Sequence, residues 1–198
     1  MSDIKNHITG FVLAGGKSSR MGQDKGLMLL HGKEMVLNIV EQLLPCVDEV
    51  LIVSNNKAYN KFGFTILEDL IKNTGPAAGI FTALKHSKTD LNIFVGCDMP
   101  FISTAAIEYL IQQATDKDIC IATANGMQHP LFGIYNKSIL NMLELLIHQN
   151  ELKLKTIIQQ FNHQLIDMSR WEIEQENLFN NINTKQDFEM AINKTVCK

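Results

Sequence analysis

The residues best suited to chemistry lie in a glycine-rich loop near the N-terminus. Gly15 and Gly16 have no Cβ atom, so the backbone there can approach an anion closely. Lys17, Arg20 and Lys25 add three cations, of which arginine can grip a phosphate through two hydrogen bonds. Successive backbone N–H groups in such a loop can form an anion-binding nest. The pattern predicts a phosphate-binding loop, although the glycines alone would also fit a solvated turn.

Two common phosphate-binding motifs do not match this loop. A dinucleotide-binding loop needs the pattern GxGxxG, whereas Gly15 and Gly16 are adjacent. Gly16-Lys17-Ser18 resembles the end of a Walker A loop, but Phe11 stands where that motif requires its first glycine. A kinase-type P-loop is therefore disfavoured.

Two carboxylates follow apolar runs that have the character of strands. Asp98 ends such a run in the segment VGCDMP, where a carboxylate can hold Mg²⁺ beside a triphosphate. The alternative is that Asp98 caps the next turn, a common place for aspartate. Asp69 follows another apolar run, and its alternative role is that of an ordinary solvated loop carboxylate. From these residues alone, both alternatives stay open.

Short apolar runs alternate with longer amphipathic segments in the first 125 residues. This alternation predicts an α/β fold with a doubly wound, mostly parallel, Rossmann-like sheet and helices on both faces. Right-handed crossovers then bring the loops after the strands to one edge of the sheet, where ligands bind in such folds. The glycine-rich loop, Asp69 and Asp98 all fall at such strand ends. We expect strands at 8–13, 50–53, 64–67, 91–95 and 119–122, and helices at 35–44, 77–86 and 103–113.

The pattern changes after about Gly126. We expect a strand at 129–135, helices at 137–148 and 152–160, a short strand near Leu165 and a final helix from about Thr184. Thr184 and Asp187 have the spacing of a capping box. We expect a single domain over residues 1–198, with a half that binds a nucleoside triphosphate at 1–125 and an acceptor-binding half at 126–198.

Composition argues against several classes of partner. The 198 residues carry a net charge of −3, so no global basic field attracts nucleic acid. The polar N-terminus has no signal-peptide core, and no apolar run is long enough to span a membrane. These features predict a cytoplasmic protein with no membrane contact. The six histidines do not show the HxxxH spacing of a metal site, and the cysteines form no CxxC pair, so they are expected to be scattered buried thiols: Cys46, Cys97, Cys120 and Cys197.

The string LAGGKSSRMGQDKG, from Leu13 to Gly26, resembles the signature of nucleotidyltransferases that use a nucleoside triphosphate and release pyrophosphate. Within that class it is most similar to the molybdenum cofactor guanylyltransferases, the MobA family. The resemblance extends over about residues 8 to 190, with its stronger motifs in the first half. It implies a nucleotide-diphospho-sugar-transferase-like fold. CDMP matches the CDxP motif of the family, and GPAAG matches its GPLAG motif with Ala77 in place of leucine.

The resemblance also implies which residues bind the nucleotide. The backbone at Leu13, Ala14, Gly15 and Gly16 would hold guanine and phosphates. Two cations, Lys25 and Arg20, would be catalytic residues that bind the phosphates of the nucleotide.

The same resemblance assigns the remaining nucleotide-binding positions. Asp98 would bind Mg²⁺ as a catalytic residue, and Asp69 would contact the nucleotide. Ser54 stands where the family has an asparagine that contacts the base, so a neighbouring Asn55 or Asn56 could supply that contact instead.

In the second half, the NxNT segment resembles a part of the family that binds the pterin. Asn181, Asn183 and Thr184 are the residues concerned, with helix capping and turn formation as the equally plausible structural role. His129 begins the segment HPLFGIY, which resembles the family's entry to the acceptor side; its alternative role is that of a packing or surface histidine.

The resemblance implies transfer of GMP from GTP to the phosphate of molybdopterin, with Mg²⁺ as cofactor and pyrophosphate as product. The acceptor phosphate is already ionised, so no general base is needed, and catalysis would consist of positioning and charge neutralisation. The alternatives are a cytidylyltransferase, a transferase with another phosphate acceptor, or a non-catalytic nucleotide-binding module. Transient contacts with proteins that make or receive the molybdenum cofactor are a further expectation.

Overall fold

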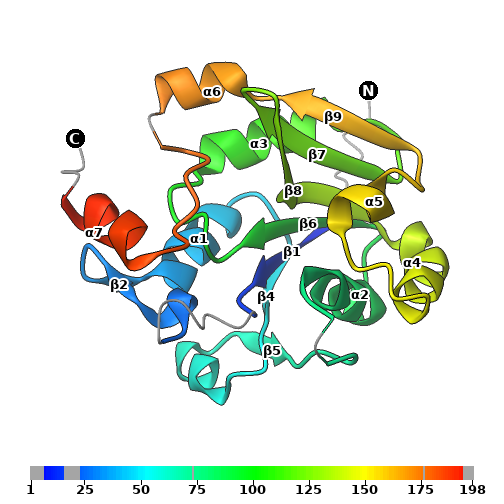
Figure 1. Ribbon diagram of the computed structural model, residues 1–198, viewed down its shortest axis with the longest axis horizontal. Helices are drawn as coiled ribbons and strands as arrows, with labels where there is room; N and C mark the ends of the chain where they lie inside the picture. Colours follow the sequence, from blue (N-terminus) through cyan, green and yellow to red (C-terminus); the bar gives the residue numbers. More distant parts are fainter. Residues whose placement is uncertain (1–6, 16–22, 73, 176, 194–198) are drawn as a thin grey trace.

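The computed structural model describes residues 7–15, 23–72, 74–175 and 177–193, and its fold is drawn in Figure 1. Seven strands form one sheet: β1 (Ile8–Leu13), β4 (Glu49–Val53), β5 (Thr65–Leu67), β6 (Leu91–Gly96), β7 (Ile119–Ala124), β8 (Met127–Asn136) and β9 (His163–Asp167). Their order is β5-β4-β1-β6-β8-β7-β9. A separate two-stranded ribbon consists of β2 (Leu29–Leu30) and β3 (Lys33–Glu34).

Every neighbouring pair in the sheet is parallel except the two pairs that contain β8. The predicted mostly parallel sheet is therefore confirmed, and the predicted strand at 129–135 is β8. Its direction follows from the turn before it. Asn125 and Gly126 have φ values of 49° and 76°, the positive values that a two-residue hairpin turn requires. The Asn-Gly pair therefore turns the chain straight back beside β7.

Helices connect the strands, and most begin close to where the sequence predicts. Ser103 accepts a hydrogen bond from the amide of Ala106, and Pro76 occupies the first turn of its helix, as expected for helix starts. The α-helices are α1 (Met35–Leu43), α2 (Pro76–His86), α3 (Thr104–Gln113), α4 (Leu140–His148), α5 (Leu154–Ile158), α6 (Ser169–Glu174) and α7 (Lys185–Asn193). The short 3₁₀ helices are η1 (Lys25–Leu27), η2 (Lys57–Phe62) and η3 (Lys137–Ile139).

Three helical segments differ from the prediction. The segment predicted as a helix at 152–160 is helical only from Leu154 to Ile158. Residues 137–139 form a 3₁₀ turn before α4, because Asn136 accepts a hydrogen bond from the amide of Ser138 and caps that turn. Helix α6 was not predicted, since its six residues are too few to show a helical period.

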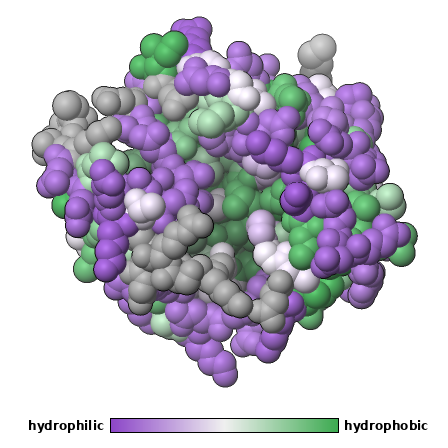
Figure 2. Space-filling model, viewed as in Figure 1, coloured by the Kyte–Doolittle hydropathy of each residue, from purple (hydrophilic) through white to green (hydrophobic). Residues whose placement is uncertain are grey.

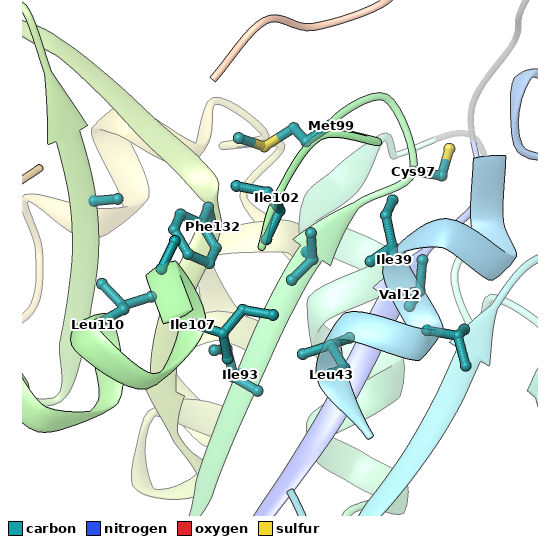
Figure 3. Packing of buried hydrophobic residues seen from close by; sticks show 14 of the residues in the cluster. Val12, Ile39, Leu43, Ile93, Cys97, Met99, Ile102, Ile107, Leu110 and Phe132 are labelled. Atoms are coloured by element: carbon teal, nitrogen blue, oxygen red, sulfur yellow. The ribbon is translucent and has the colours of Figure 1, made fainter. Parts of the chain in front are cut away.

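The sheet has one apolar cluster on each face. Successive residues of a strand point to opposite faces, and in β1 Ile8 and Val12 join one cluster while Phe11 and Leu13 join the other. The first cluster contains the buried faces of α1 and α3, and the second contains those of α2, α4 and α5. Figure 3 shows the first cluster, where side chains of α1 and α3 meet those of β1, β6 and β8. The predicted helices on both faces are thus confirmed.

A third, smaller cluster holds the C-terminal helix against the N-terminal half. Met28, Leu30 and Met35 from the region of the ribbon pack with Ile182 and Ala191. Figure 1 shows α7 beside β2 accordingly. This packing brings the NxNT segment close to the residues that follow the glycine-rich loop.

Two of the expected buried thiols are buried, those of Cys97 and Cys120, whereas Cys46 is half-buried and Cys197 lies outside the described residues. Within the described ranges, no helix combines the length and the apolar character needed to cross a bilayer.

Candidate active site

A cleft of about 840 Å³ opens at the carboxyl edge of the sheet. Leu13 pairs in register with Val53 on one side and with Gly96 on the other, so β1, β4 and β6 end at the same level. Figure 2 shows a hollow on this face, with apolar residues at its floor and hydrophilic residues along part of its rim. The residues that line the cleft are Leu13, Ala14, Gly15, Asp24, Lys25, Val53, Ser54, Asn55, Asn56, Lys57, Asp69, Gly75, Pro76, Gly79, Cys97, Asp98 and Leu131.

The structure brings most of the predicted site residues to this cleft. They are Leu13, Ala14, Gly15, Lys25, Ser54, Asp69 and Asp98. Gly16 and Arg20, which were predicted to bind phosphate, lie outside the described residues. The volume is within the range of about 300 to 1,000 Å³ that is usual for small-molecule sites.

Asp98 lies just after β6 and is held firmly through its backbone. Its carbonyl oxygen accepts a hydrogen bond of 2.8 Å from the amide of Ile182, in the loop before α7. A Cβ atom on Gly96 would lie 2.7 Å from Oδ1 of Asp98, so the carboxylate occupies space that only glycine leaves free. Burial raises the pKa of the Asp98 carboxyl, and the nearby Lys25 ammonium opposes that rise. A cation beside this carboxylate would therefore be bound favourably.

Asp69 stands across the cleft, after β5, and is paired with Asn55. The side-chain amide of Asn55 donates to Oδ2 of Asp69 at 2.7 Å, and its oxygen accepts from the backbone N–H of Asp69 at 3.0 Å. Burial raises the pKa of Asp69, and the hydrogen bond from Asn55 opposes that rise. The two bonds fix the direction of this carboxylate.

Ser54 supports the loop after β1 rather than presenting a free hydroxyl. It is buried, and its hydroxyl donates to the carbonyl oxygen of Ala14 at 3.1 Å. The Ser54 hydroxyl oxygen also accepts a hydrogen bond of 3.2 Å from the backbone amide of Asn56. The amide of Ala14 donates to Val53 at 2.9 Å, so the start of the glycine-rich loop is tied to β4. The Ser54 hydroxyl can thus set the position of the loop backbone without touching a ligand.

Lys25 begins η1, directly after Asp24. Its ammonium donates to the side-chain oxygen of Asn183 at 2.8 Å. Asp24 accepts hydrogen bonds from the hydroxyl of Tyr59 at 2.5 Å and from the side-chain amide of Asn56 at 2.9 Å. The sequence analysis does not identify Asp24 and Tyr59, because no motif links the residue before η1 to a residue in η2.

A second cavity of about 510 Å³ adjoins the cleft. Pro76, Asp98 and Leu131 line both, and residues 128–131 and 152–156 together with Asn181 line the second. The two cavities thus meet at Pro76, Asp98 and Leu131.

His129 lies in the wall of this second cavity. Its ring is buried and stacks on Phe179 with the centroids 4.6 Å apart. Nε2 is buried and has no hydrogen-bond partner among the described residues. Burial lowers the pKa of His129, and the charge of Lys155 lowers it further. His129 therefore packs against Phe179, as one of the two expected roles requires, but packing does not account for its Nε2 atom. A buried imidazole nitrogen usually has a hydrogen-bond partner.

The residues of the NxNT segment divide between helix capping and the lining of the site. Thr184 and Asp187 form the expected capping box: the amide of Asp187 donates to the Thr184 hydroxyl at 3.1 Å, and the amide of Thr184 donates to Asp187 Oδ2 at 2.8 Å. Asn183 contacts Lys25, and Asn181 lines the second cavity. Capping therefore accounts for Thr184, whereas the two asparagines face the site.

Among the described residues, no three histidine, cysteine, aspartate or glutamate side chains converge as a metal cluster. Asp98 and Asp69 are carboxylates on the cleft wall. One or two carboxylates with substrate phosphates and water form a usual Mg²⁺ site, whereas a protein-only cage is not required. The donor set of the cleft therefore fits Mg²⁺ bound together with a phosphorylated ligand.

Comparison with known proteins places the chain in a family. Residues 10–165 match the MobA-like NTP transferase domain. The chain is 36% identical over 166 residues to a protein of Flavobacterium johnsoniae named a probable molybdenum cofactor guanylyltransferase, covering 83% of this chain and 87% of that one. It is 35% identical over 180 residues to the molybdenum cofactor guanylyltransferase of Vibrio parahaemolyticus, covering 89% and 90%.

A solved structure supports the same assignment. The molybdopterin-guanine dinucleotide biosynthesis protein A of Archaeoglobus fulgidus superposes with a TM-score of 0.80 at 26% identity, covering 92% of this chain and 96% of that one. The predicted nucleotidyltransferase fold is confirmed, and so is the resemblance drawn from the LAGGKSSRMGQDKG motif. With its sheet, its cleft and these relatives taken together, the chain belongs to the MobA-like NTP transferase family of nucleotidyltransferases.

Proposed function

We propose that this enzyme transfers GMP from GTP to the phosphate of molybdopterin and releases pyrophosphate. The observation that carries the proposal is the meeting of two cavities at Asp98, one next to the glycine-rich loop and one next to the acceptor segments. The names of the curated relatives supply the substrates, and those relatives match the chain over most of their length. We infer that residues 1–125 bind the nucleotide and that residues 126–198 bind the acceptor.

GTP binds in the larger cleft. The backbone of Leu13, Ala14 and Gly15, held to β4 by the Ser54 hydroxyl, contacts the base and the phosphates. Gly16, Arg20 and Lys25 contact the phosphates as the family motif implies.

Base recognition in the cleft falls to the wall formed after β4 and β5, beside the start of the glycine-rich loop. The Ser54 side chain is buried, whereas Asn55 is exposed and Asn56 is half-buried on the cleft wall, so Asn55 and Asn56 are the better candidates to contact the base. Asp69 completes this wall, fixed by Asn55.

Asp98 would hold Mg²⁺ next to the phosphates of GTP, together with phosphate oxygens and water. When bound, Mg²⁺ neutralises charge on the phosphates as pyrophosphate leaves. The protein's own part is positioning: Ile182 and the absence of a side chain at Gly96 fix the Asp98 carboxylate, and Lys25 adds a cation to the same place. The acceptor phosphate needs no general base, since it is already ionised, so electrostatic preorganisation accounts for catalysis.

The acceptor binds in the second cavity. Lys153 and Lys155 line it and supply positive charge for an anionic ligand, while Leu152 and Leu154 supply apolar contact for a heterocycle. Asn181 provides a polar contact near the junction with the cleft. An acceptor bound here directs its phosphate towards Asp98, which lines both cavities. Proteins that deliver or receive the pterin would meet the enzyme at the mouth of this cavity.

Two measurements test the proposal in order. The first is thermal unfolding with GTP, CTP, ATP and UTP, each with and without Mg²⁺; a ligand at a hundredfold excess over Kd stabilises the folded state by about 2.7 kcal/mol. We expect GTP with Mg²⁺ to stabilise most, whereas a preference for CTP would support a cytidylyltransferase. The second is release of pyrophosphate from GTP with molybdopterin. Absence of release from a protein that binds GTP would overturn the reaction and favour a non-catalytic nucleotide-binding module.

A further inference from the structure

The short helix that carries Lys25 rests on a buried tyrosine. Tyr59, in η2, is fully buried, and its hydroxyl donates to Oδ1 of Asp24, 35 residues away in the chain. Asp24 immediately precedes Lys25 and caps η1 by accepting from the amide of Gly26 at 3.1 Å. The tyrosine hydroxyl and the start of η1 are thus joined through one carboxylate.

Both oxygens of the Asp24 carboxylate are occupied. Oδ1 receives the Tyr59 hydroxyl and the Gly26 amide, and Oδ2 receives the side-chain amide of Asn56 at 2.9 Å. Asn56 in turn caps η2 by accepting from the amide of Ala58. The two 3₁₀ helices are therefore locked to one another by donors that converge on a single side chain.

The Tyr59 hydroxyl is also tightly packed against Gly26. A Cβ atom on Gly26 would lie 2.3 Å from the hydroxyl oxygen, far inside van der Waals contact. The residue after Lys25 must therefore be glycine for the hydroxyl to lie beneath η1. Burial raises the pKa of Tyr59 far above its usual range, so the phenol remains a hydrogen-bond donor at every working pH.

The far end of the Lys25 side chain is also held. Its ammonium donates to Asn183 across 158 residues of sequence. Lysine has a flexible stem with several rotatable bonds, so restraint before ligand binding reduces the entropy lost on binding. Asp24, Asn56 and Lys25 line the cleft, whereas Tyr59 is not among the described residues that do.

We propose that Tyr59 is a positioning residue, which acts through Asp24 to hold η1 so that Lys25 faces the triphosphate. It does not touch substrate. The inference rests on the proposed function only in that Lys25 is taken to bind the phosphates of the nucleotide. A purely structural role for Tyr59 would lower stability and leave recognition of phosphate unchanged.

The test is Tyr59→Phe, which keeps the ring and removes the hydroxyl, with Tyr135→Phe as the matched control. Tyr135 is equally buried, and its hydroxyl makes one hydrogen bond, of 2.7 Å, to the carbonyl of Pro130. Each variant loses one hydrogen bond donated by a buried hydroxyl, so we expect the melting temperature of both to fall by about 2–6 °C.

Binding of inorganic triphosphate, GTP and guanosine by titration calorimetry separates positioning from stability. We expect Tyr59→Phe to weaken the binding of GTP and of inorganic triphosphate by about 10-fold, since small displacements of a binding group are costly. Guanosine, which has no phosphate, should bind within about twofold of the wild type, and Tyr135→Phe should bind all three ligands normally. Equal affinities of Tyr59→Phe and the wild type for inorganic triphosphate would overturn the inference.

Lys25→Ala separates failure of this inference from failure of the proposed function. If Lys25→Ala binds triphosphate as tightly as the wild type, the assignment of Lys25 to the phosphates is wrong, and the positioning role with it. If Lys25→Ala weakens binding and Tyr59→Phe does not, only the positioning role is wrong. The inference expects Tyr59→Phe to have little further effect in the Lys25→Ala background, because both changes act through one contact. Should Tyr59→Phe not fold, Asp24→Ala, which removes the acceptor of the Tyr59 hydroxyl, replaces it.

Discussion

Replacing Asp98 with asparagine should affect activity and stability in opposite directions. The substitution keeps the size of the side chain, and the hydrogen bond from Ile182 goes to the backbone carbonyl, so it survives. Only the negative charge is lost. In the proposed function that charge holds Mg²⁺ during turnover, whereas in the free protein the carboxylate is buried and desolvation disfavours its ionised form.

The expected loss of activity is large. A bound metal ion contributes several kcal/mol of transition-state stabilisation, and each 1.36 kcal/mol is a factor of ten in rate. Loss of about 4 kcal/mol would therefore lower the rate about 10³-fold.

The sign of the stability change follows from the raised pKa of Asp98. Between the ordinary carboxyl pKa and the raised one, the folded state binds more protons than the unfolded state, so stability falls as pH rises through that window. At pH values above both pKa values, the whole penalty for the ionised group is present. Asparagine removes this penalty, so the variant should melt at a higher temperature than the wild type in the absence of nucleotide and Mg²⁺.

Pyrophosphate release from GTP and molybdopterin measures the first effect, and thermal unfolding of the free protein measures the second. Asp116→Asn is a suitable control, because Asp116 is an exposed carboxylate in the turn before β7, at the opposite edge of the sheet. It should change neither quantity appreciably. Activity of Asp98→Asn within tenfold of the wild type would refute the metal assignment, and a lower melting temperature would refute the argument from burial.

Three further predictions concern single side chains. Gly96→Ala should lower activity at least tenfold in the pyrophosphate assay, because the new Cβ would lie 2.7 Å from Asp98 Oδ1 and must displace that carboxylate; wild-type turnover would contradict this. Ser54→Ala should lower the free energy of unfolding by about 1 kcal/mol in denaturant titration and weaken GTP binding, because Ala14 loses the hydrogen bond from a buried hydroxyl; unchanged GTP affinity would show that the loop holds without it. His129→Gln should flatten the decline of melting temperature from pH 7 to pH 5. Burial lowers the folded-state pKa of this histidine, so the unfolded state binds more protons than the folded state as pH falls through about 6.5. The wild type therefore loses stability in that range. Parallel plots of melting temperature against pH for the wild type and the variant would refute that reasoning.

Local patterns in the sequence were sufficient to predict most of the fold. The strand ending at Leu13, the helix opened by Pro76 and the helix capped by Ser103 each depend on residues within a few positions of one another. Alternation of such elements implies a parallel sheet, and a parallel sheet brings the ends of its strands to one edge. The positions of Asp69 and Asp98 at a common edge therefore follow from the sequence alone.

The direction of β8 is an intermediate case. The pair Asn125-Gly126 is a strong hairpin signal, but the segment after it was interpreted only as a strand entering from a turn. Its place between β6 and β7 depends on which strands it pairs with. One of these strands, β6, lies about 40 residues earlier in the chain. Pairing of this kind depends on register across the whole sheet.

The sequence by itself determined the class of the fold, the placement of the glycine-rich loop after a strand, and the family, because each is encoded in short, contiguous patterns. Only the tertiary structure decided what each polar side chain does. Ser54 bonds to the loop backbone, Asn183 holds Lys25, and Tyr59 lies beneath η1. The physical reason is that a hydrogen bond needs two atoms within about 3 Å. Whether residues 35 or 158 positions apart come that close depends on the packing of the elements between them.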